Sequence, residues 1–136
     1  MKRWLLDTSA LLTLRDDEPG AERVAELLHL AQQGRAECLA CFMTGMELLY
    51  RIWRDEGEAA GRLAHEQCLA LPIQWVHESP ELLLRAAELK ASYPLSLADA
   101  WIAASALEAN AILVHKDPEF DAVPVAQEPL PYKRAR

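Results

Sequence analysis

The sequence predicts an α/β fold in which helices cover both faces of a mainly parallel sheet. Short apolar runs alternate along the chain with longer segments whose apolar residues recur at helical spacing. Strands separated by helices are joined by right-handed crossovers, so they pair in parallel and the helices pack on the sheet. The 136 residues match the length of one domain, and we expect residues 1–136 to form a single domain.

The N-terminal part of the chain predicts a strand, two helices and a second strand. Residues 2–6 (KRWLL) are a short apolar run, and residues 8–14 (TSALLTL) continue as a helix that stops in the turn-rich segment RDDEPG. Residues 21–34 carry a helical stripe of apolar side chains, with Gly34 as the C-terminal cap. Residues 36–42 (AECLACF) are typical of a second strand.

Two more helices and a third strand follow. The helices are expected at residues 45–57 and 58–71, and residues 73–76 (IQWV) form a short strand after Pro72. The helix expected at residues 79–93 opens with serine and proline, an N-cap followed by proline at the first helical position.

The C-terminal part predicts one more helix and the last strands. Residues 96–110 form a helix of mostly small apolar residues, and residues 111–115 (AILVH) form the fourth strand. Residues from about 126 to 136 are a proline-containing basic tail, in which we expect one edge strand before the chain frays.

Composition and charge restrict the possible functions. Hydrophobic residues make up 51% and charged residues 26%, as in ordinary soluble proteins, and no apolar run reaches the roughly 20 residues of a membrane span. The N-terminus lacks a signal-peptide core, so we expect a cytoplasmic protein. The net charge of −7 argues against broad, non-specific binding of nucleic acid. Cys38, Cys41 and Cys68 lack the partners of a zinc site and are expected to be buried thiols.

Four carboxylates occupy one kind of place in the predicted fold. Asp7 ends the first strand, Asp117 follows the fourth, and Glu47 and Asp99 lie in the first turns of two helices. In a parallel sheet the carboxyl ends of strands and the N-termini of the following helices share one edge, where ligands bind. The topology therefore brings several of these acids together.

Each acid also has a purely structural interpretation. The segments TGME and SLAD are capping-box patterns, in which Thr44 and Ser96 cap helices that carry Glu47 and Asp99 in their first turns. Asp7 could cap the helix that follows it in the same way. For any one acid alone, capping is the simpler explanation.

Asp99 is the acid for which a capping role is the least sufficient explanation. The residues three, four and seven positions onward are Ile102, Ala103 and Ala106, all apolar. A helix that is apolar nearly all round is buried, and Asp99 is buried with it. A buried ionised carboxylate is costly unless it is paired, hydrogen-bonded or bound to a metal.

Converging carboxylates would favour a hard cation. Two unit charges about 4 Å apart repel by around 4 kcal/mol at an effective dielectric constant near 20. A cluster of oxygen ligands without His or Cys suits Mg²⁺ or Mn²⁺ rather than zinc. Such ions can activate a water and stabilise the leaving oxygen of a phosphodiester. The predicted chemistry is therefore metal-assisted phosphodiester hydrolysis.

Four segments in this order and spacing resemble the signature of the PIN-domain ribonucleases. They are LLDTSALL near the start, TGMELL, LSLADAWIAASAL and LVHKDPEF. The resemblance covers residues 3 to about 123, and it is closest to the toxin components of bacterial VapBC-type toxin–antitoxin pairs.

The resemblance implies a PIN-like three-layer α/β/α sandwich and Mg²⁺- or Mn²⁺-dependent cleavage of single-stranded RNA, leaving 5′-phosphate and 3′-hydroxyl ends. By position, Asp7, Glu47, Asp99 and Asp117 match the acidic catalytic and metal-binding residues, and Ser9 matches a hydroxyl near that site. It also implies a homodimer, and inhibition by a small antitoxin whose C-terminal segment covers the acidic cleft.

Two positions depart from the family pattern or leave a choice. His115 stands where the family often has Thr; it can form structural hydrogen bonds or add a ligand, and we expect the structural role. The segment KDPEFD offers Asp117, Glu119 and Asp121; its position favours Asp117 as the fourth ligand, with Asp121 in reserve.

Basic residues close to these acids could contact phosphate oxygens. Arg51 and Arg54 follow Glu47 by about one and two helical turns, and Lys116 precedes Asp117. Solvation is the more common state of such side chains.

Two other functional classes remain open at this stage. One is a catalytically silent module that binds RNA or a partner protein. The other is a receiver-like phosphoacceptor, in which Lys116 would follow a late strand. That class requires an adjacent acidic pair after the first strand, and the chain has only Asp7 there.

Overall fold

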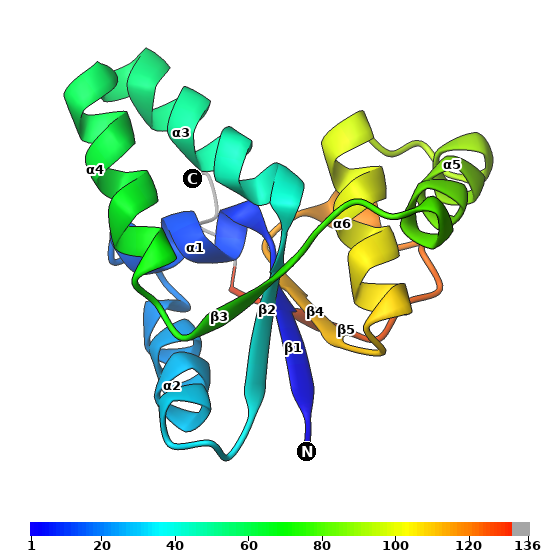
Figure 1. Ribbon diagram of the computed structural model, residues 1–136, viewed down its shortest axis with the longest axis horizontal. Coiled ribbons are helices and arrows are strands. Elements are labelled where there is room, and N and C mark those ends of the chain that lie inside the picture. The colour runs from blue at the N-terminus through cyan, green and yellow to red at the C-terminus, as the bar shows by residue number, and fades with distance from the viewer. Residues whose placement is uncertain (132–136) are drawn as a thin grey trace.

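The computed structural model describes residues 1–131 and contains a five-stranded, all-parallel sheet between two layers of helices (Figure 1). The strands are β1 (Arg3–Leu6), β2 (Glu37–Cys41), β3 (Ile73–Val76), β4 (Ile112–His115) and β5 (Gln127–Pro129). The helices are α1 (Thr8–Arg15), α2 (Ala21–Gln32), α3 (Phe42–Glu56), α4 (Glu58–Leu69), α5 (Pro80–Ser92), α6 (Leu97–Glu108) and the 3₁₀ turn η1 (Pro118–Phe120). The predicted α/β/α sandwich is confirmed.

The strand order β3-β2-β1-β4-β5 puts β1 at the centre of the sheet. The chain builds outward from β1 to β2 and β3, and then returns to the other side of β1 with β4 and β5. The order therefore reverses between β1 and β4, and ligand sites of open α/β sheets form at such a point, beyond the strand carboxyl ends. Asp7 follows β1, and Asp117 lies two residues beyond β4.

Two hydrophobic cores lie on opposite faces of the sheet. Helices α5 and α6 cover one face, and α1 to α4 lie on the other side (Figure 1). The side chains of β2 alternate between the cores: Cys38 faces the core of α1 to α4, whereas Leu39 and Cys41 face the core of α5 and α6. All three cysteines, Cys68 included, are buried free thiols, and burial raises the pKa of the Cys38 and Cys68 thiols to about 11.

Most predicted helix ends agree with the structure. Gly34 follows the end of α2 at φ +72°, a conformation that favours glycine, and its N–H bonds the carbonyl of Ala31. Ser79 caps α5 through a 3.1 Å bond from the amide of Leu82, with Pro80 at the first helical position. The edge strand expected in the C-terminal tail is β5; residues 132–136 of that tail lie outside the described residues.

The start of α3 differs from the prediction. The helix begins at Phe42, directly after β2, and not at residue 45. Cys41 occupies the N-cap position without a side-chain hydrogen bond, because the chain passes from strand to helix with no intervening loop. Thr44 therefore lies inside the helix, and the expected capping box of Thr44 and Glu47 is wrong.

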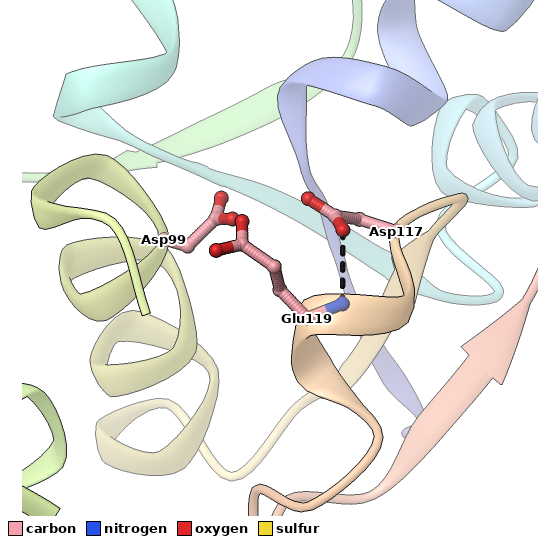
Figure 2. A group of neighbouring side chains, drawn as sticks. All are labelled: Asp99, Asp117 and Glu119. Carbon is pink, nitrogen blue, oxygen red and sulfur yellow. Dashed lines mark hydrogen bonds between the residues drawn. The ribbon is translucent and has the colours of Figure 1, made fainter. Parts of the chain in front are cut away.

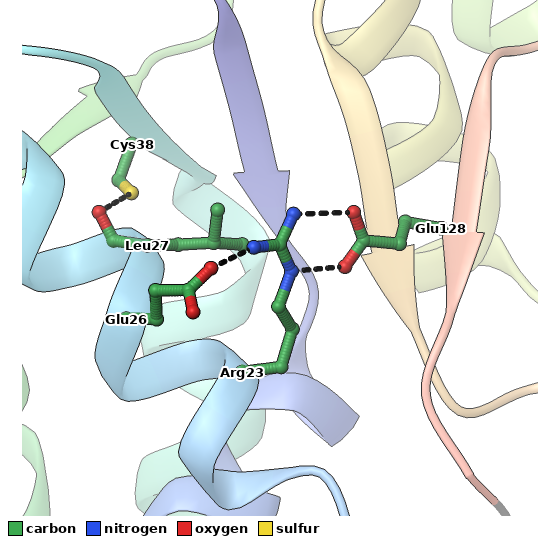
Figure 3. A network of polar contacts seen from close by, with 5 residues as sticks. All are labelled: Arg23, Glu26, Leu27, Cys38 and Glu128. Carbon is green, nitrogen blue, oxygen red and sulfur yellow. Dashed lines mark hydrogen bonds and ion pairs between the residues drawn. The ribbon is translucent and has the colours of Figure 1, made fainter.

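An ion-pair network fixes the edge strand β5 to helix α2 (Figure 3). The Arg23 guanidinium binds both carboxylate oxygens of Glu128, at 2.7 and 2.9 Å, and also donates to Glu26. It also lies over the ring of Trp4, 5.8 Å from the ring centroid. Bidentate pairs of this kind fix orientation as well as distance, so β5 is held at a defined position.

Among residues 1–131, no helix is both long enough and apolar enough to span a bilayer.

Candidate active site

Asp7 sits at the end of the central strand and caps α1. Its Oδ1 accepts a 2.8 Å hydrogen bond from the amide of Ala10, and the residue is buried. The structural interpretation of Asp7 as an N-cap is therefore confirmed. The same geometry places a carboxylate in the interior at the point where the strand order reverses.

Ser9 links Asp7 to the segment after β4. The Ser9 hydroxyl donates to Asp7 Oδ1 at 2.7 Å and accepts from the amide of Lys116 at 2.9 Å. One side chain thus joins the first strand–helix junction to the backbone just before Asp117. Ser9 therefore contacts Asp7 directly, and its role at a metal site stays a prediction.

Glu47 lies in the second turn of α3 and reaches back to α1. Its Oε1 accepts a 2.6 Å bond from the hydroxyl of Thr8, which also lies 3.3 Å from the hydroxyl of Thr44. Thr8 and Thr44 are both buried. Thr8 on α1 thus orients Glu47 on α3, and Thr44 contacts the Thr8 hydroxyl, an arrangement that the capping-box interpretation did not contain.

Asp99 lies in the first turn of α6, as predicted. Ser96 caps the helix by accepting a 3.1 Å bond from the amide of Asp99. Both Asp99 and the residues from Ile102 to Ala106 are buried, so the helix is enclosed on almost every side. The Ser96 N-cap is confirmed, and Asp99 is a buried acid in the first turn that it caps.

Asp99, Asp117 and Glu119 form the tightest acidic group in the described part of the chain (Figure 2). One carboxylate oxygen from each lies within 4.8 Å of the others. Asp117 also caps η1 by accepting a 2.9 Å bond from the amide of Glu119. The turn directs both acids from the β4–β5 connection toward Asp99 on α6.

Glu119 is the site residue that the sequence analysis did not select. The acid-rich segment KDPEFD pointed to it, but spacing alone gave no reason to prefer it. Asp121, the reserve candidate, is exposed and lies outside the group of three. The structure therefore brings Asp117 and Glu119, rather than Asp121, beside Asp99.

The acids of this edge perturb one another. Burial is the main reason that the pKa of Asp7 rises to about 7; the charges of Asp117 and Glu47 add to it, and the bonds from Ser9 and Ala10 oppose it. Burial, followed by the neighbouring Glu119 and Asp117, also raises the pKa of Asp99 well above its ordinary range. Without a compensating cation, the folded protein resists the ionisation of Asp7 and Asp99.

The donor set fits a hard divalent cation. Asp99, Asp117 and Glu119 offer carboxylate oxygens only, and Asp7 and Glu47 add two more carboxylates at the same sheet edge. Mg²⁺ and Mn²⁺ prefer such ligands, and their charge would offset the burial and the repulsion that raise the pKa values of Asp7 and Asp99. The site therefore has the composition that the sequence chemistry predicts.

The side chains of Lys116 and His115 bond groups other than the clustered carboxylates. The Lys116 ammonium donates to the carbonyl of Pro19 at 2.8 Å and lies 3.6 Å from Glu18. His115 is fully buried, and its ring nitrogens contact Gln127 and the amide of Asp117. These contacts agree with the structural role expected for His115.

A polar cleft of about 260 Å³ begins at Ser9, which bonds Asp7. None of the five site acids lines it, and its wall carries four other acids, Asp16, Glu18, Asp55 and Glu56. Ser9, Arg51 and Lys116 lie in its wall. Arg15, also in the wall, is held by Glu56 through two 2.9 Å contacts. Arg51 makes no ion pair within residues 1–131.

The comparisons with known proteins agree on the fold. The structure resembles that of VapBC2 from Rickettsia felis bound to a DNA fragment from their promoter, with a TM-score of 0.77, 18% identity, and coverage of 95% of this chain and 99% of the other. DNA-bound VapBC from Salmonella typhimurium gives a TM-score of 0.76 at 18% identity, covering 95% and 98% of the two chains.

Mycobacterium tuberculosis VapC20, described as a sarcin-ricin loop cleaving toxin, gives a TM-score of 0.69 at 17% identity, with coverage of 90% and 95%. The search of curated proteins found no significant match. The family model for the PIN domain matches residues 4–126, which include every acid of the site. The chain belongs to the PIN domain family.

Proposed function

We propose that this protein is a divalent-metal-dependent endoribonuclease, the toxin component of a toxin–antitoxin pair. The observation that carries the proposal is the acidic group of Asp99, Asp117 and Glu119, with oxygens within 4.8 Å of one another. It lies at the sheet edge of a PIN domain, beside the buried Asp7. The VapBC and VapC structures of similar fold support the toxin assignment.

The carboxylates divide into two structural sets. Asp99, Asp117 and Glu119 would hold Mg²⁺ or Mn²⁺ directly, and Asp7 and Glu47 would complete or orient the site from the other side. When bound, the cation would polarise the scissile phosphate and make a water easier to deprotonate. Thr8 holds Glu47 by a hydrogen bond, and the bond from Ser9 to Asp7 favours the ionised form of Asp7 that a cation requires.

Local contacts are the reason that an acidic protein can act on RNA. Bulk charge opposes the approach of a polyanion, since the net charge is −7. The cleft that begins at Ser9 carries the Arg51 side chain in its wall. We expect a phosphate of the RNA substrate to contact Arg51 there.

Partner proteins are part of the same proposal. The two VapBC structures of similar fold are complexes bound to DNA, so we expect a small cognate antitoxin for this chain. We also expect a homodimer, because large apolar side chains are exposed on α3, including Met46, Tyr50 and Trp53. Light scattering of the purified protein, alone and with the neighbouring gene product, tests both expectations.

Cleavage of total RNA by the purified protein tests the function. Discrete fragments should appear with Mg²⁺ or Mn²⁺ and vanish with EDTA. Asp99→Asn should abolish cleavage, whereas Asp121→Asn, an exposed acid of the same segment, should retain it. Cleavage that survives Asp99→Asn would refute the assignment. Metal binding without cleavage of any RNA would favour a silent binding module.

A further inference from the structure

Both ring nitrogens of His115 take part in hydrogen bonds, and the side chain is fully buried at the end of β4. Nδ1 accepts a 3.0 Å bond from the amide of Asp117, and Nε2 lies 2.8 Å from Oε1 of Gln127. A backbone N–H can only donate, so Nδ1 is unprotonated and Nε2 carries the proton. The ring also packs edge-on against Phe120, with centroids 4.9 Å apart.

Gln127 extends this chain of bonds to the next turn. Its Oε1 accepts from His115, and its amide nitrogen donates to the carbonyls of Phe120 and Val123 at 2.7 and 3.2 Å. Every N–H in this series of bonds meets an acceptor only if the proton of the His115 ring is on Nε2. The two side chains together fasten the amide at the start of the turn and two carbonyls at its end.

The strand that carries Gln127 is itself anchored. Glu128, the next residue, points to the other face of β5 and binds Arg23 of α2 (Figure 3). The amide of Leu130 donates to the carbonyl of His115 at 2.7 Å, which joins β5 to β4. Gln127 therefore projects from a strand whose position is fixed. Its bonds to the carbonyls of Phe120 and Val123 fix the position of that segment as well.

The segment from Lys116 to Val123, here called the acidic loop, carries two of the three clustered acids. Asp117 and Glu119 project from it toward Asp99 (Figure 2). Carboxylates this close repel one another, and a loop free to move would relieve the repulsion by separating them. The bonds at both ends of the acidic loop oppose that movement.

We propose that His115 and Gln127 are positioning residues that hold Asp117 and Glu119 beside Asp99, so that the cation site is formed before the cation arrives. This inference rests on the proposed function and adds to it the residues that set cation affinity. Partners of this kind typically change metal affinity by about 10- to 100-fold when removed.

Two variants remove the bonds, and two serve as controls. His115→Phe keeps a ring against Phe120 and removes both bonds, and Gln127→Leu removes the amide without altering β4. His115→Asn restores an acceptor for the amide of Asp117. Leu28→Ala, in the core on the other side of the sheet, destabilises the protein without touching the acidic loop.

The measurements are the Mn²⁺ dissociation constant, by electron paramagnetic resonance, and the unfolding temperature of the metal-free protein. We expect the dissociation constant to rise at least tenfold in His115→Phe and Gln127→Leu, and less in His115→Asn. Leu28→Ala should lower the unfolding temperature and leave the constant within about twofold of the parent. Nitrogen NMR of the metal-free parent should show His115 protonated at Nε2.

The outcomes separate this inference from the proposed function. If the parent binds Mn²⁺, Asp99→Asn abolishes the binding and His115→Phe binds as tightly as the parent, the positioning role is wrong and the metal site stands. A ring protonated at Nδ1 would also overturn the positioning role. If the parent binds no Mn²⁺, the proposed function fails, and the inference fails with it.

Discussion

The hydroxyl of Thr8 donates a 2.6 Å hydrogen bond to Glu47, across the gap between α1 and α3. Thr8 is the residue directly after Asp7, so one strand–helix junction orients two of the candidate catalytic acids. Two acids of this site, Glu47 and Asp7, are thus held by the neutral hydroxyl groups of Thr8 and Ser9, and substitution of those groups tests the arrangement without removing any carboxylate.

Thr8→Val should weaken both the fold and the site. The substitution keeps the shape of a buried side chain but removes the bond to Glu47, which should lower the free energy of unfolding by about 1 kcal/mol. RNA cleavage should fall about tenfold, since Glu47 loses its orienting contact. Urea unfolding and initial rates measure the two effects.

Thr13→Val is the matched control on the same helix. The Thr13 hydroxyl is buried and has no hydrogen-bond partner within residues 1–131, so its replacement by a methyl group should leave stability unchanged or slightly increased. Equal losses in the two variants would show that the Thr8 bond contributes nothing specific.

Ser9→Ala should shift the acid limb of the pH–rate profile to higher pH. The Ser9 bond favours ionised Asp7 and lowers its pKa, so removal of the bond raises that pKa further. The ratio kcat/KM at pH 7 should fall by about 10- to 100-fold. Ser105→Ala, which removes a buried hydroxyl bonded to the carbonyl of Trp101, should leave the limb in place. An unshifted limb in Ser9→Ala would contradict the role given to Ser9.

The metal-free protein should lose stability as the pH rises from about 4 to about 7. Asp7 has a pKa of about 7 in the folded protein against an ordinary 3.8, so the folded state holds the proton more tightly and is favoured at low pH. At about 1.4 kcal/mol per pKa unit, the full effect is at most about 4 kcal/mol.

Asp7→Asn keeps an oxygen acceptor for the amide of Ala10 and removes the titrating group. In EDTA its unfolding free energy should exceed that of the parent at pH 8 and approach it at pH 4. Added Mg²⁺ should stabilise the parent more than the variant. Parallel pH profiles for the two proteins would show that Asp7 does not titrate in this range.

Arg51→Ala should raise KM for RNA about tenfold with little change in kcat. The Arg51 side chain lines the cleft beside Ser9 and makes no ion pair with the described residues, so it is placed to meet a substrate phosphate. Arg54, one turn closer to the end of α3, is exposed and paired with Asp55, and Arg54→Ala should leave KM unchanged. Identical KM values in the two variants would exclude the cleft as a phosphate site.

Periodicity and turn residues were sufficient to predict the order of the strands and helices. The start of α3 was missed because the usual signal, a capping side chain, is absent. Cys41 makes no capping bond, and the apolar Phe42 and Met43 pack into the α5–α6 core as helical residues although they continue the strand's apolar run.

The topology placed Asp7, Glu47, Asp99 and Asp117 at one sheet edge, but it could not resolve their contacts. Glu119 joins Asp99 because the turn η1 redirects the chain after Asp117, and no helical or strand period describes a turn of that length. The bond from Thr8 to Glu47 joins two helices that are far apart in sequence, and the bond between His115 and Gln127 spans a loop. Sequence patterns describe neither kind of contact, so only the three-dimensional structure reveals them.

The most direct test of the metal site is a crystal structure of the protein soaked with MnCl₂, with anomalous diffraction recorded at the manganese edge. The account predicts a manganese peak in contact with one carboxylate oxygen each of Asp99, Asp117 and Glu119, and its loss in Asp99→Asn. No peak there, at Mn²⁺ concentrations that support RNA cleavage, would contradict the central claim.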